Sequence, residues 1–103
     1  MPAPKYSARP DTNQPEIVAA LTALGFLVLV VGGKLGVTPD ILVWGYNART
    51  QQHEWTAWEI KTATGKLSPA QKHFMNVLWP GAVKLTRSLD TILAYYGQGT
   101  QGA

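Results

Sequence analysis

The sequence predicts a mixed α/β domain in which helices flank a mixed central sheet, with the element order α-β-β-β-α-β-α. Three segments begin with a helix-capping residue and end at a glycine, as short helices do. Four runs rich in β-branched and aromatic residues lie between them. A short connection joins the second and third runs, which favours an antiparallel pair. A helix separates the third run from the fourth, so we expect a mixed sheet.

The first helix is expected over residues 13–24. Asn13 is a good N-cap, Pro15 lies in the first turn, and Gly25 is a natural stop. Its apolar stripe is formed by Ile17, Ala20, Leu21 and Leu24. Glu16 follows Asn13 by three residues and has two interpretations that do not exclude each other. It completes a capping box, or it reaches toward a functional site as a further carboxylate.

The strands are expected at residues 26–31, 40–46, 53–61 and 82–86. The first is continuously apolar, which is typical of a strand covered on both faces. The second and third flank the polar turn 47–52 and should form a hairpin.

A second helix is predicted over residues 68–79. Ser68 is its N-cap, Pro69 occupies the first position, and Gln71 completes an S-x-x-Q capping box. The last helix is predicted from Ser88 through Tyr95 and Tyr96.

The composition fits one compact domain, which we place at residues 11–97, between an N-terminal arm at 1–10 and a tail at 98–103. No apolar run reaches about 18 residues and no signal peptide is recognisable, so neither a membrane span nor secretion is expected. The lack of cysteine excludes a disulfide framework and fits a cytoplasmic location. A net charge of +3 suits an anionic partner such as nucleic acid.

The chain has only six acidic residues, and two of them fall at the ends of adjacent strands. Asp40 opens the second strand, while Glu59 and Lys61 share one face of the third, because alternate residues in a strand point the same way. A hairpin can bring these side chains into one half-buried pocket. Two carboxylates, with the Ile60 carbonyl as a third ligand, can hold a hard divalent cation.

Such a site suits phosphodiester hydrolysis, which needs an activated water and charge neutralisation at phosphorus. Lys61 can orient the water or stabilise the developing negative charge. Gln71, at the start of the second helix, either steers the water or serves only as a cap. The structural alternative for the whole set is an aspartate at a turn beside a Glu59–Lys61 surface ion pair.

These residues resemble the PD-(D/E)xK nuclease superfamily, and within it the small phage-type VRR-NUC-like nucleases. The resemblance covers residues 9–96 and follows four short motifs in order. They are Asp11-Thr12-Asn13-Gln14-Pro15-Glu16, Pro39-Asp40-Ile41-Leu42, Glu59-Ile60-Lys61 and Leu67-Ser68-Pro69-Ala70-Gln71.

The resemblance implies a restriction-endonuclease-like core, α-β-β-β-α-β, and endonuclease (hydrolase) activity on DNA, in some members on branched DNA. It implies that Glu16, Asp40 and Glu59 bind Mg²⁺ or Mn²⁺, that Lys61 is catalytic, and that Gln71 assists. It also implies homodimers among the minimal members, and a bacterial or phage-infected host cell as the setting.

Other residues have weaker functional interpretations. Contact with phosphate is one interpretation of several basic residues, and a solvated charge is the other: Lys34, Arg49, Lys66 and Lys72. His53 and His73 are too isolated in the sequence to indicate a zinc pair. Core or interface anchors are the first interpretation of the four tryptophans, and stacking on an unpaired base is the second: Trp44, Trp55, Trp58 and Trp79.

The sequence therefore predicts a metal-dependent deoxyribonuclease. One alternative is a non-catalytic nucleic-acid-binding module that retains the fold, and another is an interaction protein that assembles through its aromatic surface.

Overall fold

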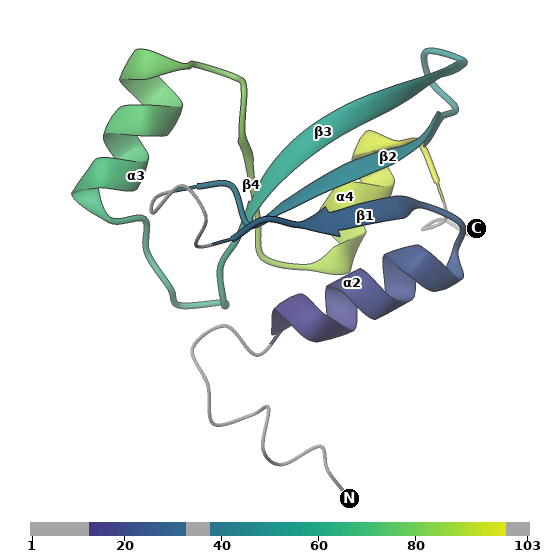
Figure 1. Cartoon of the computed structure of the whole chain (residues 1–103), viewed down its shortest axis with the longest axis horizontal. Helices are drawn as coiled ribbons and strands as arrows, with labels where there is room; N and C mark the ends of the chain where they lie inside the picture. Colours follow the sequence, from purple (N-terminus) through teal and green to yellow (C-terminus); the bar gives the residue numbers. More distant parts are fainter. Residues whose placement is uncertain (1–12, 33–37, 99–103) are drawn as a thin grey trace, which may run out of the picture.

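The computed structural model describes residues 13–32 and 38–98, and it shows the predicted element order (Figure 1). The elements are α2 (Asn13–Ala23), β1 (Leu27–Val30), β2 (Ile41–Asn47), β3 (Gln52–Ile60), α3 (Pro69–His73), the π-helical turn η1 (Phe74–Leu78), β4 (Lys84–Thr86) and α4 (Leu89–Tyr95). The prediction of a mixed α/β fold is confirmed. The arm 1–10 and Lys34 lie outside the described residues, as does most of the predicted tail.

The four strands form one mixed sheet in the order β1-β2-β3-β4. β1 pairs with β2 and β2 with β3, both antiparallel, whereas β3 and β4 are parallel. Asn47 fixes the hairpin turn between β2 and β3, because its Oδ1 accepts hydrogen bonds from the amides of Arg49 and Thr50. The prediction of a mixed sheet with a β2–β3 hairpin is confirmed.

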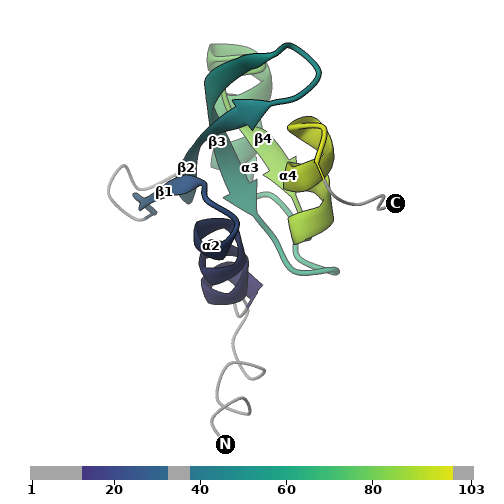
Figure 2. The same cartoon turned by 90° about the vertical axis from the view of Figure 1, so that its right-hand side faces the viewer.

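Two helices cover one face of the sheet. α2 packs against β1, α4 packs against β4, and the two helices contact each other (Figure 2). The core that they enclose includes Ile17, Leu21, Ile41, Val43, Trp58, Ile60, Ile92, Leu93 and Tyr96. α3 stands to one side of the strands, away from α2 and α4 (Figure 1).

Polar groups inside the core are hydrogen-bonded to one another. The Tyr96 hydroxyl lies 2.7 Å from Thr56 Oγ1 and within 3.1 Å of the Val43 carbonyl. Trp58 Nε1 donates to the same Thr56 oxygen at 2.7 Å. Burying these two large aromatic side chains is therefore compatible with the requirement that buried polar atoms find partners.

The prediction that the first strand is covered on both faces is wrong. β1 is an edge strand, and Leu27, Leu29 and Val30 are 49%, 41% and 54% exposed. α2 packs against it from one side, and no described element pairs with its outer edge. A continuously apolar run does not reveal whether its neighbours cover both of its faces, because that depends on where the strand falls in the sheet.

Two smaller expectations about the helices also differ from the structure. The segment predicted as a single helix over 68–79 is α-helical only to His73, and it continues as the π-helical turn η1. Asn13 Oδ1, the atom that an N-cap would use, has no hydrogen-bond partner among the described residues. Instead, Asn13 Nδ2 donates to the carbonyl of Lys61. Within the described residues, no helix is long and apolar enough to cross a membrane.

Candidate active site

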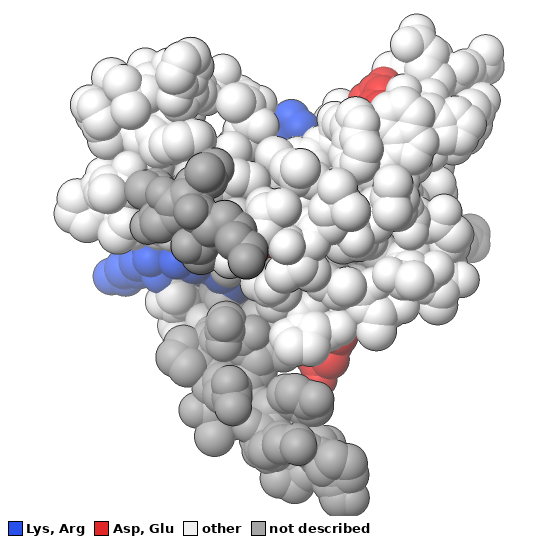
Figure 3. Space-filling view, viewed as in Figure 1, with Lys and Arg blue, Asp and Glu red and all other residues white. Residues whose placement is uncertain are grey.

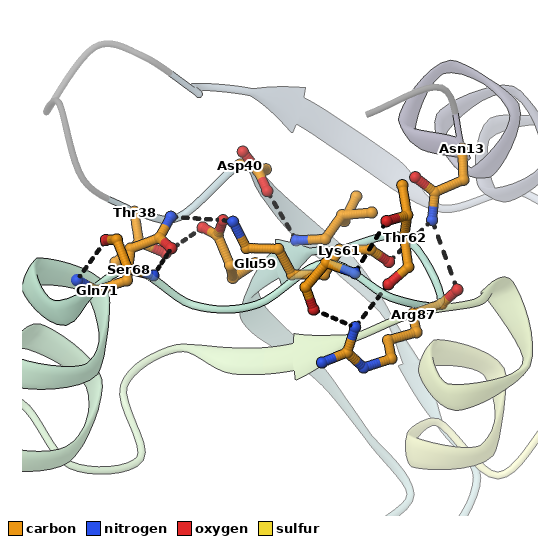
Figure 4. Close-up of polar contacts among 11 residues, drawn as sticks. Asn13, Thr38, Asp40, Glu59, Lys61, Thr62, Ser68, Gln71 and Arg87 are labelled. Carbon is orange, nitrogen blue, oxygen red and sulfur yellow. Dashed lines mark hydrogen bonds and ion pairs between the residues drawn. The ribbon is translucent and has the colours of Figure 1, made fainter. Parts of the chain in front are cut away.

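Asp40 lies where the ends of β1, β2 and β3 meet. Its amide donates to the Trp58 carbonyl at 2.9 Å, and its own carbonyl accepts from the amides of Val31 and Gly32, each at 2.9 Å. The carboxylate is fixed as well, because Asp40 Oδ2 accepts from the Ile60 amide at 2.7 Å (Figure 4). Hydrogen bonds from the residues after β1 on one side and from β3 on the other thus fix Asp40 at the start of β2.

Gly32 packs closely against Asp40. A Cβ at Gly32 would lie 3.2 Å from Asp40 Oδ1, closer than most side-chain contacts allow. The absence of a side chain at Gly32 therefore leaves room around the second carboxylate oxygen.

Glu59 is buried, with 2% of its surface exposed, and three donors surround its carboxylate. The Thr38 hydroxyl donates to Oε1 at 2.5 Å, and Gln71 Nε2 donates to Oε2 at 2.8 Å. Lys61 Nζ lies 3.5 Å from the same Oε2 (Figure 4). The expected neighbours Glu59, Lys61 and Gln71 are thus brought together.

Burial raises the pKa of Glu59, because the ionised carboxylate loses hydration. The hydrogen bond from Thr38 opposes this rise, the nearby charge of Asp40 adds to it, and Lys61 lowers the pKa again. A carboxyl whose ionisation is hindered by burial and by a second acid attracts a proton or another cation. This electrostatic balance fits a site that holds a divalent metal.

Ile60 contributes its backbone to the site while its side chain is buried in the core. The N–H and C=O of one strand residue point to the same edge, and the Ile60 N–H points at Asp40. Its carbonyl therefore faces the β2 side, where Asp40 lies, as a third metal ligand would require.

The backbone of Lys61 is held from two sides. Its amide donates to the Thr86 carbonyl at 2.9 Å, and its carbonyl accepts from Asn13 Nδ2 at 3.2 Å. Arg87 Nη1 closes the following loop by donating to the carbonyls of Thr62 and Gly65, both at 2.6 Å. Lys61 therefore leaves the sheet at a fixed point, with its ammonium group directed to Glu59.

Gln71 forms the predicted capping box and also contacts Glu59. Ser68 Oγ accepts a hydrogen bond from the backbone N–H of Gln71 at 3.1 Å. The side-chain oxygen of Gln71, Oε1, accepts one from the backbone N–H of Ser68 at 2.9 Å, which completes the predicted capping box. The remaining amide nitrogen of Gln71 donates to Glu59. The N-terminus of α3 is thereby tied to the acid.

Glu16 does not join the other two acids. It is exposed, and it lines a cavity of about 260 Å³ together with Ile17 and Leu89. Across 13–32 and 38–98, no three Asp, Glu, His or Cys residues lie close enough to share a metal ion. The structure brings only Asp40 and Glu59 together, and a metal-binding role for Glu16 stays a prediction.

Of the basic residues expected at phosphates, Arg49 lies in the β2–β3 turn, at the other end of the hairpin from Asp40 and Glu59. Lys66 is exposed in the loop after β3, and Lys72 is exposed on α3. The face shown in Figure 3 is mostly uncharged, and much of its positive charge gathers below α3.

Three residues that hold the site together were not singled out from the sequence as site residues: Thr38, which donates to Glu59, and Asn13 and Arg87, which hold the loop after Lys61. Their contacts span 21 to 48 residues of chain, so no local sequence pattern indicates them.

No protein-family model, curated protein or solved structure matches this chain.

Proposed function

We propose that this protein is a Mg²⁺- or Mn²⁺-dependent nuclease that hydrolyses phosphodiester bonds in DNA, with a restriction-endonuclease-like core of the PD-(D/E)xK type. One observation carries the proposal. Asp40, buried Glu59, the Ile60 backbone and the Lys61 ammonium group converge where β2 and β3 meet. An acid pair beside a lysine is the donor set that such hydrolysis needs.

Asp40 and Glu59 would hold the metal, with the Ile60 carbonyl as a further oxygen ligand. Each carboxylate keeps acceptor sites beyond the hydrogen bonds it already accepts, because an ionised carboxylate has about four. Bound there, a divalent cation supplies an activated water and neutralises charge on the phosphate.

The chain's own groups complete the chemistry. Lys61 orients the attacking water or stabilises the negative charge that develops on the phosphate oxygens. Thr38 and Gln71 position Glu59 by donating to its two oxygens. Lys66 and Lys72 contact phosphates on either side of the bond that is cut.

The test is cleavage by the Asp40→Ala and Lys61→Ala variants. We expect each variant to lose at least about 100-fold in rate, because each removes a group that acts on the charge of the transition state. Labelled linear, single-stranded and branched DNA are the substrates, with Mn²⁺ present. Asp90→Ala, which removes an exposed carboxylate on α4, should cut like the wild type.

Far-ultraviolet circular dichroism and thermal unfolding show whether these variants keep the fold. If both variants unfold, Asp40 and Lys61 have a structural role and the proposal loses its support. If the wild type binds Mn²⁺ normally but cuts no form of DNA, the protein is not a nuclease.

A second candidate is a nucleic-acid-binding module without catalysis. One observation favours it: the partners Thr38, Gln71 and Lys61 already satisfy and fix the Glu59 carboxylate. DNA binding measured with and without Mg²⁺ separates the two candidates. A pure binding module should gain no affinity from the metal.

A further inference from the structure

The face of the sheet opposite α2 and α4 carries a cluster of aromatic rings on the β2–β3 hairpin. The ring centroids of Trp44 and Trp55 are 5.3 Å apart, and His53 stacks on Trp44 at 5.7 Å. Tyr46 meets His53 edge to face at 5.3 Å. Trp55 is 50% exposed, although a ring of this size is usually buried in a core.

A cavity of about 350 Å³ lies beside this cluster. Leu42 and Ala57, which face each other across β2 and β3, contribute to its lining, with Trp55 next to them. Gly81 and Ala82, from the loop before β4, are also part of the lining, and Thr56, Lys84 and Tyr95 line it on the side toward α4. Figure 3 shows a hollow with a basic group at its base between the α3 side and the hairpin.

The cavity and the candidate active site lie along the same strand, β3. Trp55, Ala57 and Glu59 alternate along β3 and therefore share one face of the sheet. At about 3.3 Å per residue, Ala57 lies roughly 7 Å and Trp55 roughly 13 Å from Glu59 along the strand. A DNA strand that has one phosphate at Glu59 and runs along β3 would therefore pass over the cavity before it reaches the aromatic cluster.

Resting on the proposed function, we infer that this cavity binds an unpaired base of single-stranded DNA next to the bond that is cut. An exposed indole offers a stacking surface that every base can use. Lys84 also lines the cavity, and its Nζ lies 4.9 Å from the centre of the Tyr95 ring, toward α4. The cluster of Trp44, Tyr46, His53 and Trp55 contains no lysine or arginine, which suits stacking better than a grip on the many phosphates of a duplex.

The experiment measures binding separately from cutting. Fluorescence anisotropy of a labelled oligothymidylate and of a blunt duplex is recorded with the full chain in EDTA. We expect Trp55→Ala to weaken single-strand binding about tenfold or more, since stacking on one aromatic ring contributes that much. Trp55→Phe, which keeps an aromatic face, should retain most of the affinity.

Trp79→Ala is the matched control, because Trp79 is 59% exposed but does not line the cavity. Equal losses in Trp55→Ala and Trp79→Ala, or single-strand binding unchanged in Trp55→Ala, would overturn the inference. A wild-type dimer that dissociates in Trp55→Ala would also overturn it, because a second copy would then cover this face.

The two proposals fail separately. Cutting with Mn²⁺ but unchanged binding in Trp55→Ala leaves the nuclease and removes the base site. Loss of single-strand binding in Trp55→Ala, without any cutting by the wild type, supports the base site and removes the nuclease.

Discussion

Glu59 is a buried acid whose ionisation affects the stability of the fold. Its burial raises its pKa, so ionising it destabilises the folded state. Protonated Glu59 therefore makes its full contribution to the free energy of unfolding at pH values below the ordinary carboxyl pKa of about 4.3. That contribution is lost as the pH rises through the raised pKa of Glu59 in the folded state. A bound divalent cation would reverse this effect, because it prefers the ionised form.

We expect the stabilisation by Mn²⁺ to grow as pH rises through the pKa of Glu59. The measurement is the difference in melting temperature with and without Mn²⁺ at a series of pH values, since a ligand that binds only the folded state raises that temperature. Glu59→Gln should remove most of the Mn²⁺ effect, whereas Asp90→Asn, at an exposed site, should keep it. A Mn²⁺ effect that is independent of pH, or that persists in Glu59→Gln, would contradict a metal ligand at this position.

At the scale of elements, one close contact joins the segment before β1 to the middle of β2. The Phe26 ring lies directly over Gly45, where a Cβ would collide with it. Phe26 is buried and also meets Tyr96 of the α4 segment edge to face, with ring centroids 5.1 Å apart. The ring therefore has little freedom to move aside, and a glycine in this strand is required by packing.

Gly45→Ala should lower the free energy of unfolding by about 1–3 kcal/mol, as overpacking in a well-packed core does. Urea denaturation followed by circular dichroism measures the change. A Gly45→Ala/Phe26→Leu double variant should lose less than the sum of the two single variants, because the smaller side chain makes room for the new methyl group. A loss below about 0.5 kcal/mol in Gly45→Ala would show that the Phe26 ring moves aside easily.

At the scale of the whole molecule, the β1 edge of the sheet has no described strand paired with it and is open to pairing with another chain. From Thr22 to Gly32 there is no charged residue, and β1 exposes large apolar side chains along this stretch. Edge strands usually carry charges or prolines that prevent pairing with another chain. We therefore expect the protein to associate with itself through β1 as its concentration rises.

Leu29→Lys should suppress this association, because a charge on the edge strand disfavours pairing with another copy. Sedimentation velocity over a range of concentrations measures it. The free energy of unfolding should change by less than about 0.5 kcal/mol, as Leu29 is partly exposed. Leu78→Lys replaces an exposed leucine in η1 and should associate like the wild type. Equal effects of the two substitutions would indicate that the contact does not involve β1.

Local sequence patterns were sufficient for most of the fold. The Ser68 and Gln71 capping box and the alternation of the hairpin strands are short-range signals, and the structure contains both. The proximity of Asp40 and Glu59 could be predicted from the sequence, because a short turn joins their strands. Asp40 comes just before the first strand of the hairpin, and Glu59 lies near the end of the second. The position of β1 could not be derived, because a leucine and valine run has the same composition at an edge as at the centre of a sheet.

The sequence by itself determined the order of the elements, the hairpin, and the set of acids and lysine that the proposed chemistry uses. These features depend on residue type and on short spacings, and both can be read directly along the chain. Only the tertiary structure decided that Thr38 and Gln71 hold Glu59, that Glu16 stays apart, and that an aromatic face remains open beside the site. Those features depend on contacts between distant residues, and packing decides which of them form.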